Sequence, residues 1–377
     1  MLHGGEIYDK KIELDFSVSL NPCGCPGEVK DALSGAICDA DKYPDMSQMK
    51  FREAVARAEN ALMNATCSQG ESEKSLDEDF KGLEPYNIIG GNGASELLSA
   101  IINMLGPVKA LLPVPSFYGY VHALNMADGC EILTYRLREE DGFELGEEFV
   151  ESITNDIDMV ILGNPNNPTG KCIKKSVLED VLEKCKELGV ALVVDECFFR
   201  LCSISQAISA RDYLDRYDNL YVVDAYTKLF SIPGVRVGFC LSQPENIERL
   251  RQFLPEWNMS VFAQAAGIAC AKTLSDDKKS FMDSTTELIR TEREYLSSEL
   301  EKLGIKVFDS DTNFILIRMS EGHDLYHMLL NNHILIRDGS TFESLTGGFY
   351  RIAVKDHESN KRLLQFMRTY SHPLYFY

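Results

Sequence analysis

The chain has 377 residues, which predicts two domains because a single hydrophobic core rarely serves more than about 300 residues. The formal net charge of −20 argues against a nucleic acid or an anionic membrane as partner, since both are polyanions. The first residues lack the basic and apolar regions of a signal peptide. No apolar run approaches the ~18 residues that a membrane-spanning helix needs.

The cysteine usage predicts a reducing compartment. The chain has 11 cysteines, an odd number, and several lie in apolar segments, as Cys197, Cys240 and Cys270 do. Reduced thiols that fill a core are the simplest explanation, so we expect a cytoplasmic protein. Cys23 and Cys25 have no second Cys/His pair at zinc spacing, and we therefore predict no metal site.

The N-terminal part of the chain combines a short mixed segment with two helical stretches. Residues 12–19 mix apolar and polar side chains before an Asn-Pro pair, and helical patterning follows at 27–38 and 47–64. Residues 65–84 are rich in acidic side chains and poor in large apolar ones, a composition that is typical of a solvated loop.

From about residue 86 to 245, short β-rich runs alternate with helical segments. This alternation predicts a mostly parallel sheet flanked by helices, in which ligands bind beyond the carboxyl ends of the strands. The expected strands are Ala110–Val114, Glu131–Tyr135, Met159–Leu162, Ala191–Val194, Leu220–Ala225 and Val237–Leu241.

A long charged helix near 275–303 leads to a smaller α/β part. We predict an N-terminal arm and the start of the small domain over 1–40, a large domain over 41–275 and a small C-terminal domain over 276–377. The acidic segment 65–84 is expected to be a loop or an insertion in the large domain. The expected elements of the small domain are strands Lys306–Phe308, Phe314–Arg318, Ile334–Ile336 and Tyr350–Val354, and a final helix near 357–370.

Lys228 stands just beyond an apolar run that indicates a buried strand. Burial lowers the pKa of an ammonium group, and a neutral amine can form a Schiff base. Arg236 follows nearby, and its permanently charged guanidinium suits a phosphate. An amine for an aldehyde and a guanidinium for a phosphate together point to pyridoxal 5′-phosphate (PLP). Taken alone, however, a lysine at a strand end is more often a surface residue.

Four further features follow or adjoin expected strands. Segment 88–98 is a glycine-rich turn that leads into an amphipathic helix, whose first N–H groups can bind an anion. Loop 163–170 contains Asn167, whose amide can donate to a phenolate-like oxygen. Asp195 ends a buried strand and needs a cation, such as a protonated ring nitrogen, while Phe117 could stack on a flat ring. The ordinary alternatives are a capped turn, an Asn-Pro turn, a helix N-cap and a core aromatic.

In order and spacing these residues resemble PLP enzymes of fold type I, and the chain is similar to the class I/II aminotransferase family over nearly its whole length. The resemblance implies the PLP-transferase fold of type I, an α/β fold with a large, mostly parallel sheet domain and a small C-terminal α/β domain. It implies that Lys228 binds PLP covalently and that Asp195 pairs with its pyridine nitrogen. The further cofactor contacts that it implies are Gly93, Ala94, Ser95, Phe117, Asn167, Thr227 and Arg236.

The resemblance also implies contacts with a substrate and with a second subunit. Tyr43 resembles the tyrosine that reaches the cofactor phosphate from a neighbouring subunit, so we expect a homodimer. Arg351 matches the arginine that grips the substrate α-carboxylate, and Arg337 resembles an arginine that reads a substrate phosphate. Asn21 is the third expected substrate contact. The expected ligands are therefore PLP and a small amino acid or amino-phosphate.

Within the family two branches compete, the threonine-phosphate decarboxylases and the histidinol-phosphate aminotransferases. The His-Gly-Gly sequence at 3–5 and the Leu-Asp-Phe-Ser sequence at 14–17 resemble the decarboxylases. Phe198 does so too, because the aminotransferases usually carry a tyrosine there. We therefore predict a PLP-dependent decarboxylase of a phosphorylated amino acid, with a transaminase of the histidinol-phosphate type as the alternative.

Some residues depart from the family pattern. Ala225 replaces a serine that often contacts the cofactor phosphate, and Glu6 stands where an asparagine is expected. A further alternative is a PLP-binding protein without turnover. Such a protein would have lost a chemical residue, whereas Lys228, Asp195 and Arg351 are all present.

Overall fold

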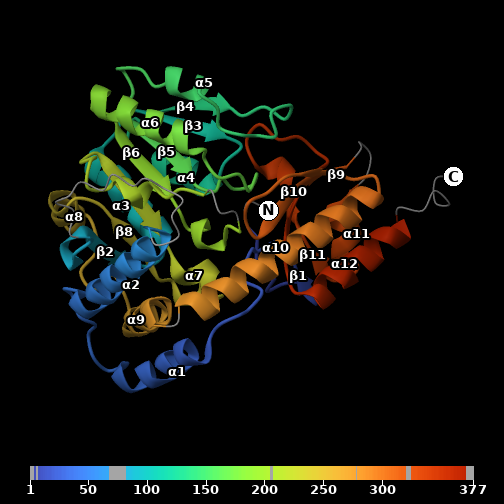
Figure 1. The fold of residues 1–377 in the computed structure, drawn as a ribbon, viewed down its shortest axis with the longest axis horizontal. Helices are drawn as coiled ribbons and strands as arrows, with labels where there is room; N and C mark the ends of the chain where they lie inside the picture. Colours follow the sequence, from blue (N-terminus) through green and yellow to red (C-terminus); the bar gives the residue numbers. More distant parts are fainter. Residues whose placement is uncertain are drawn as a thin grey trace.

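The structure is a computed structural model that describes residues 4–5, 7–67, 82–203, 207–276, 278–319 and 324–370. The predicted acidic segment 65–84 therefore lies mostly outside the described residues. Figure 1 shows a larger body that contains the N-terminal helices and the central sheet, and a smaller C-terminal body in orange and red. In the described part of the chain, no helix is both long and apolar enough to cross a bilayer.

A seven-stranded sheet forms the centre of the larger body. The strands follow the order β2-β8-β7-β6-β5-β3-β4, and β8 runs antiparallel to both of its neighbours while the other pairs are parallel. The α/β architecture with a mostly parallel sheet is as predicted. The strands are β2 (Ile88–Gly91), β3 (Lys109–Val114), β4 (Glu131–Arg136), β5 (Met159–Gly163), β6 (Ala191–Asp195), β7 (Leu220–Asp224) and β8 (Gly238–Leu241).

Helices cover both faces of this sheet, which explains why its central strands are apolar throughout. In β5, Val160 and Leu162 belong to the hydrophobic core of one face, whereas Met159 and Ile161 belong to the core of the other face. The first core is closed by α1 (Gly27–Gly35), α2 (Met49–Cys67), α5 (Glu148–Glu151), α6 (Lys175–Leu188) and α9 (Val261–Asp276), and the second by α3 (Ala94–Leu105), α4 (Tyr118–Asn125) and α8 (Pro244–Arg251).

The smaller body contains a four-stranded antiparallel sheet with the order β12-β13-β10-β9. A separate parallel pair joins β1 (Leu14–Asp15) to β11 (Ile334–Leu335), so the N-terminal segment is part of this body. The remaining elements are β9 (Lys306–Phe308), β10 (Phe314–Arg318), β12 (Arg337–Asp338), β13 (Phe349–Ala353), α10 (Lys278–Lys302), α11 (Leu325–Leu330) and α12 (His357–Tyr370). Short helices complete the fold: α7 (Tyr226–Leu229) and the 3-10 turns Ala36–Asp39, Pro85–Asn87, Phe199–Leu201, Ala210–Tyr213, Pro233–Val235 and Gly339–Thr341.

Two details differ from the expected elements. The expected strand Ile334–Ile336 ends one residue early, because β11 pairs with β1 only as far as Leu335, and the chain then enters β12, which pairs with β13. Segment 88–91, which was expected to be part of a turn, forms β2. Gly90 in this strand has no room for a side chain, because a Cβ there would lie 2.2 Å from the sulfur of Met259.

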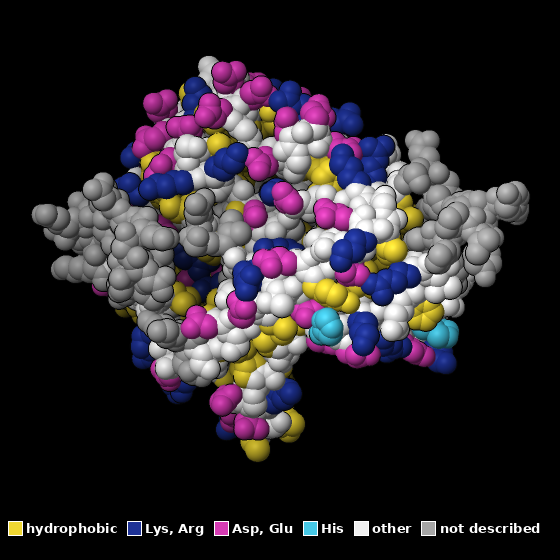
Figure 2. Space-filling model, turned by 45° about the vertical axis from the view of Figure 1, so that its right-hand side comes forward, with side chains coloured by type: hydrophobic (Ala, Val, Ile, Leu, Met, Phe, Trp, Pro, Cys, Tyr) yellow, Lys and Arg dark blue, Asp and Glu magenta, His cyan; other side chains and the backbone are white. Residues whose placement is uncertain are grey.

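Acidic and basic side chains are intermingled over the face shown in Figure 2. Several ion pairs on the surface are short-range pairs on one helix or turn, such as Lys42 with Asp39 and Arg290 with Glu287. Exposed pairs of this kind contribute little to stability, since solvent screens them.

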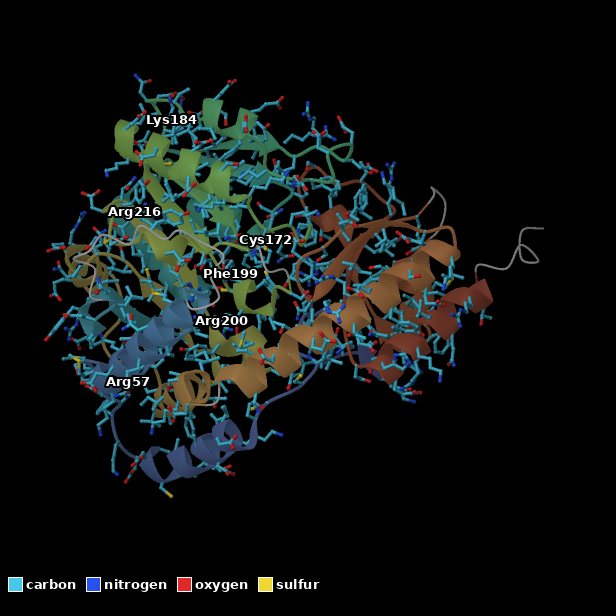
Figure 3. The ribbon with its side chains drawn as sticks, viewed as in Figure 1. Arg57, Cys172, Lys184, Phe199, Arg200 and Arg216 are labelled. Carbon is cyan, nitrogen blue, oxygen red and sulfur yellow. The ribbon has the colours of Figure 1, made fainter. Side chains whose placement is uncertain are left out.

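A buried network of five charged side chains has a different character. It comprises Glu59 on α2, Asp224 on β7, and Glu196, Arg200 and Arg211, all at most 8% exposed. Arg200 and Arg211 each bridge Glu59 and Asp224, and Arg211 also bonds Glu196 at 2.8 Å. Figure 3 shows Arg200 beside the blue helix α2. The network therefore ties α2 to the carboxyl ends of β6 and β7.

Burial and attraction act in opposite directions on these carboxyl groups. Burial raises the pKa of Glu196 and of Asp224 in spite of the neighbouring arginines. At Glu59 burial acts in the same direction, but attraction by Arg200 and Arg211 outweighs it, and the pKa is lowered. Glu59 is thus the most firmly ionised of the three carboxyl groups, and it contacts both buried guanidinium groups.

We predict that Glu59→Gln destabilises the protein by about 3–5 kcal/mol, because it removes the ionised carboxylate that contacts both buried guanidinium groups. Urea unfolding measures the change in the free energy of unfolding. The matched control is Asp39→Asn, which removes the acidic partner of the exposed pair with Lys42 and should change stability by less than about 0.5 kcal/mol. Equal losses in the two variants would contradict the importance of the network.

Candidate active site

A cavity of about 260 Å³ lies between the larger and the smaller body, at the carboxyl ends of the parallel strands. Residues from both bodies line it. Those that the sequence analysis predicted as site residues are Ala94, Ser95, Phe117, Asn167, Asp195, Thr227, Lys228, Arg236, Arg337 and Arg351.

One end of the cavity is suited to an anion. Ala94 and Ser95 line it as the first residues of α3, and no side chain caps this end of the helix. Gly93, with φ of 83°, precedes them, and a Cβ there would lie 2.4 Å from Nη2 of Arg236. The glycine thus lets the guanidinium approach the helix N-terminus. Together with the hydroxyl of Thr227, these groups can bind a phosphate.

Asp195 is the last residue of β6, and its carboxylate is held by two donors. Oδ1 accepts a hydrogen bond from the backbone N–H of Cys197 at 3.0 Å, and Oδ2 accepts one from the hydroxyl of Tyr120 at 2.9 Å. Burial and the charge of Asp195 raise the pKa of Tyr120 well above its usual value, so the phenol remains a donor. Among the described residues Asp195 has no cationic partner within salt-bridge distance.

Lys228 lies in α7, just beyond β7. Burial, followed by repulsion from Arg351, lowers the pKa of its ammonium group to about 8. Its Nζ lies 5.8 Å from the ring centre of Phe198. A substantial fraction of this lysine is therefore a neutral amine near neutral pH, as a nucleophile requires.

Two arginines of the smaller body stand side by side in the cavity wall. Arg337 on β12 and Arg351 on β13 are directly paired in the register of the sheet and are 4% and 6% exposed. Arg351 donates from Nη1 to Oδ1 of Asn167 and from Nη2 to the carbonyl oxygen of Ser17, both at 2.6 Å. Burial and the charge of Arg337 lower the pKa of Arg351 to about 9. Paired like charges of this kind favour the binding of anions.

Three predicted site residues do not line the cavity. Gly93 lies close to the guanidinium group of Arg236, as described above. The side chain of Asn21 is buried and donates to the carbonyl oxygen of Leu229 at 2.8 Å and to Oγ1 of Thr285 at 2.9 Å. Asn21 therefore anchors the N-terminal segment in this structure. Tyr43 is 82% exposed, and its ring lies 4.7 Å from that of Trp257.

Sequence reasoning missed several groups in the cavity wall. Tyr120 could have been found, because it lies one helical turn after Phe117 and thus on the same face of α4. Cys197 was interpreted as a core thiol but lines the cavity beside Asp195. Ser17 and Ser19 line it as well, and the buried hydroxyl of Ser19 has no hydrogen-bond partner among the described residues. Ser17 belongs to the sequence at 14–17 that resembles the decarboxylases, whereas no sequence signal distinguished Ser19 from its neighbours.

The residues of the cavity fit PLP. Lys228 offers an amine of lowered pKa, and the N-terminus of α3 with Arg236 offers a site for the phosphate. Asp195 is a positioned carboxylate that still lacks a cation, which a protonated pyridine nitrogen would supply. Phe117 lines the same cavity with a partly exposed ring.

Comparisons with known proteins agree with this site. The profile of the family aminotransferase class I and II matches residues 11–367. A protein of Caldanaerobacter subterraneus subsp. tengcongensis, provisionally named threonine-phosphate decarboxylase, is 33% identical over 370 residues, covering 97% of this chain and 93% of that protein. The threonine-phosphate decarboxylase of Salmonella typhimurium is 29% identical over 377 residues, covering 97% of this chain and 95% of that protein.

Solved structures give the same result. The crystal structure of the histidinol-phosphate aminotransferase from Clostridium acetobutylicum superposes with a TM-score of 0.79 at 29% identity, covering 95% of this chain and 99% of that chain. The family profile spans nearly the whole chain, and so does a relative of more than 30% identity. The chain therefore belongs to the class I and II aminotransferase family, and it is a PLP-dependent enzyme of fold type I.

Proposed function

We propose that the protein is a PLP-dependent decarboxylase of a phosphorylated amino acid, of the threonine-phosphate decarboxylase type. The observation that carries the proposal is the pair Arg337 and Arg351, two buried guanidinium groups on adjacent strands in one cavity wall. A ligand with two anionic groups relieves their mutual repulsion. Threonine phosphate has such groups, an α-carboxylate and a phosphate.

The cofactor has a complete set of contacts in this proposal. Lys228 would hold PLP covalently, and Asp195 would pair with its ring nitrogen. Bound PLP supplies an acceptor for the electron pair of a bond that breaks at the substrate Cα. The remaining contacts would come from Gly93, Ala94, Ser95, Phe117, Asn167, Thr227 and Arg236.

The protein's own contribution to the choice of reaction is orientation. Which bond at the substrate Cα would break with PLP bound depends on how the protein orients the substrate, and a decarboxylase must orient the carboxylate for cleavage. Arg337 and Arg351 can fix two ends of one substrate and thereby set this orientation. Phe198 lies against Lys228 where a tyrosine would add a hydroxyl, and its ring keeps that side of the amine apolar.

Transamination of histidinol phosphate is the second candidate. It is favoured by the likeness to the Clostridium acetobutylicum structure, whose name gives that activity. Arg337 could read the phosphate of either substrate. Histidinol phosphate, however, has no carboxylate and would leave Arg351 without an anion of its own, so the arginine pair favours the decarboxylase.

We also propose that the protein is a homodimer in which Tyr43 reaches the cofactor phosphate in the neighbouring subunit. Tyr43 lies outside the cavity of its own chain, and its exposed ring packs against that of Trp257, which is itself 42% exposed. Apolar surfaces of this kind mark interfaces between proteins. The cytoplasmic location inferred from the cysteines stays a prediction.

The proposed reaction is tested by incubating the PLP-bound protein with threonine phosphate, serine phosphate and histidinol phosphate in separate reactions. We expect CO2 from threonine phosphate and no conversion of the bound cofactor to its amine form, which absorbs at shorter wavelength. Accumulation of that amine form with histidinol phosphate, without CO2 from any substrate, would instead establish the transaminase.

We predict that Arg337→Ala reduces the stabilisation of the transition state for threonine phosphate by about 2–5 kcal/mol, because the phosphate loses a buried charged partner. The slow reaction with unphosphorylated threonine should hardly change. Arg351→Ala serves as the matched variant and should impair both substrates, since both have an α-carboxylate. The measurement is kcat/KM for each pair of variant and substrate. Equal losses on both substrates in Arg337→Ala would show that the phosphate is bound elsewhere.

We predict that two impaired variants complement each other when their subunits are mixed. Tyr43→Ala weakens the cofactor site of the neighbouring subunit. Lys228→Ala abolishes activity at the site of the subunit that carries the substitution. In a mixed dimer, the site with an intact Lys228 also receives an intact Tyr43 from the other subunit. Activity should therefore return after the two variants are unfolded and refolded together. No recovery, or a monomer in solution with full activity, would refute a shared site.

We predict that the reactivity of Lys228 in the PLP-free protein rises with pH around a midpoint of about 8, because the pKa of its ammonium group is lowered to that value. Above the midpoint the amine is neutral and reacts. Acetylation followed by peptide mass spectrometry measures the rate at each pH. In Arg351→Gln the midpoint should move upward, since a repelling charge is lost. The control is Arg362→Gln, which removes an exposed arginine paired with Glu13 and should leave the midpoint unchanged.

A further inference from the structure

Cys172 and Cys202 bring their sulfur atoms to within 3.2 Å of each other. Cys172 lies in the loop after β5, which also carries Asn167. Cys202 follows the 3-10 turn after Phe198. Both thiols are partly buried, in contrast to Cys185 and the other fully buried core cysteines. The expectation that the cysteines only fill the core therefore does not describe this pair.

The pair stands at the junction of the two bodies. Figure 3 places Cys172 where the green and yellow elements meet the orange and red ones. Asp311, from the smaller body, accepts from the N–H of Cys172 through Oδ2 at 2.9 Å and from the N–H of Ser203 through its carbonyl oxygen at 3.0 Å. Its own N–H donates to the carbonyl oxygen of Gly170 at 2.9 Å. Asp311 of the smaller body is thus hydrogen-bonded to the loop that contains Cys172 and to the segment that contains Cys202.

The same two loops reach the cofactor cavity. Asn167 and Phe198 line it, and Asn167 accepts the hydrogen bond from Arg351. A change in the spacing of Cys172 and Cys202 therefore acts on the cavity and on the contact between the bodies at once.

We propose that Cys172 and Cys202 form a reversible disulfide bond that lowers the activity of the enzyme under oxidising conditions. The oxidant is a peroxide. The thiolate of Cys172 attacks a peroxide oxygen, the O–O bond breaks, and Cys172 becomes a sulfenic acid while the leaving oxygen takes a proton. The sulfur of Cys202 then attacks the sulfur of Cys172, and water leaves with the proton of the second thiol. A dithiol reductant reverses the reaction by thiol–disulfide exchange.

The order of the two steps follows from the surroundings of the thiols. Burial raises the pKa of Cys202 well above its usual value, and hydrogen bonding and proximity to Cys172 add to this effect. Cys202 therefore remains a thiol at neutral pH and serves as the resolving group. Arg293 on α10 acts in the opposite direction, and its positive charge favours the developing negative charge during resolution.

A disulfide bond requires the sulfur atoms to approach more closely than 3.2 Å, so at least one of the two cysteine side chains, or the loop that carries it, must move. Displacements of about 1 Å in an active site can cost about 100-fold in rate. The disulfide bond would also restrict the motion of the two loops to which Asp311 is hydrogen-bonded. We therefore expect oxidation to lower turnover, and reduction to restore it.

The test starts from the PLP-bound, reduced protein, treated with graded hydrogen peroxide and then digested without reductant. Peptide mass spectrometry should find the peptides of Cys172 and Cys202 joined, with the loss of two hydrogens. Turnover of the best substrate should fall about 10- to 100-fold and recover with dithiothreitol. The variants Cys172→Ser and Cys202→Ser should keep turnover after the same treatment, whereas the control Cys38→Ser, which removes an exposed thiol, should lose it as the parent does.

Two results would overturn the proposal. One is the absence of the joined peptides at peroxide levels that already oxidise Cys38. The other is an equal, reversible loss of turnover in Cys172→Ser, which would place the sensitive thiol elsewhere, for example at Cys197 in the cavity wall. The peptide analysis needs no substrate, so it decides the disulfide even if the proposed decarboxylation fails.

Discussion

The buried ion network around Glu59 is the constraint on which the cofactor site depends. Asp195 and Lys228 lie at the ends of adjacent strands and can serve one cofactor only if those ends keep their relative position. Glu196 directly follows Asp195, and Asp224 ends the strand that leads to Lys228. Arg211 bonds both of these carboxylates, and all the partners are buried. Because buried charges tolerate few arrangements, the network specifies one geometry for the strand ends.

The arginine pair transmits a second constraint, from the smaller body to the larger one. Arg351 is held on β13, yet its guanidinium donates to Asn167 in the loop after β5 and to the backbone of Ser17. The substrate site is thus built from three distant parts of the chain. A ligand that binds to Arg337 and Arg351 also affects the position of Asn167, because Asn167 is hydrogen-bonded to Arg351. Substrate recognition and cofactor geometry are therefore coupled.

The sequence was sufficient for the fold and for many of the residues that line the cavity, for a physical reason. Strands buried on both faces are continuous apolar runs, and the polar residue that ends each run must lie at the ligand-binding edge, as Asp195 and Asn167 do. The spacing of residues along the sequence does not show in which direction each side chain points. Asn21 was expected at the substrate, but its amide is bonded to Leu229 and Thr285, while the unremarkable Ser19 lines the cavity. The approach of Cys172 to Cys202 likewise depends on tertiary packing that no local pattern encodes.

The pairing of β1 with β11 has a consequence for the synthesis of the enzyme. Leu14 leaves the ribosome long before its partner Ile334 has been made. Residues 17–19, which follow β1, therefore cannot take their places in the cavity wall until the chain has been translated beyond Ile334. Long-range pairing of this kind is slow to form and leaves early segments unprotected. A nascent chain can assemble the central sheet first, but it becomes competent for substrate only when these two distant segments meet.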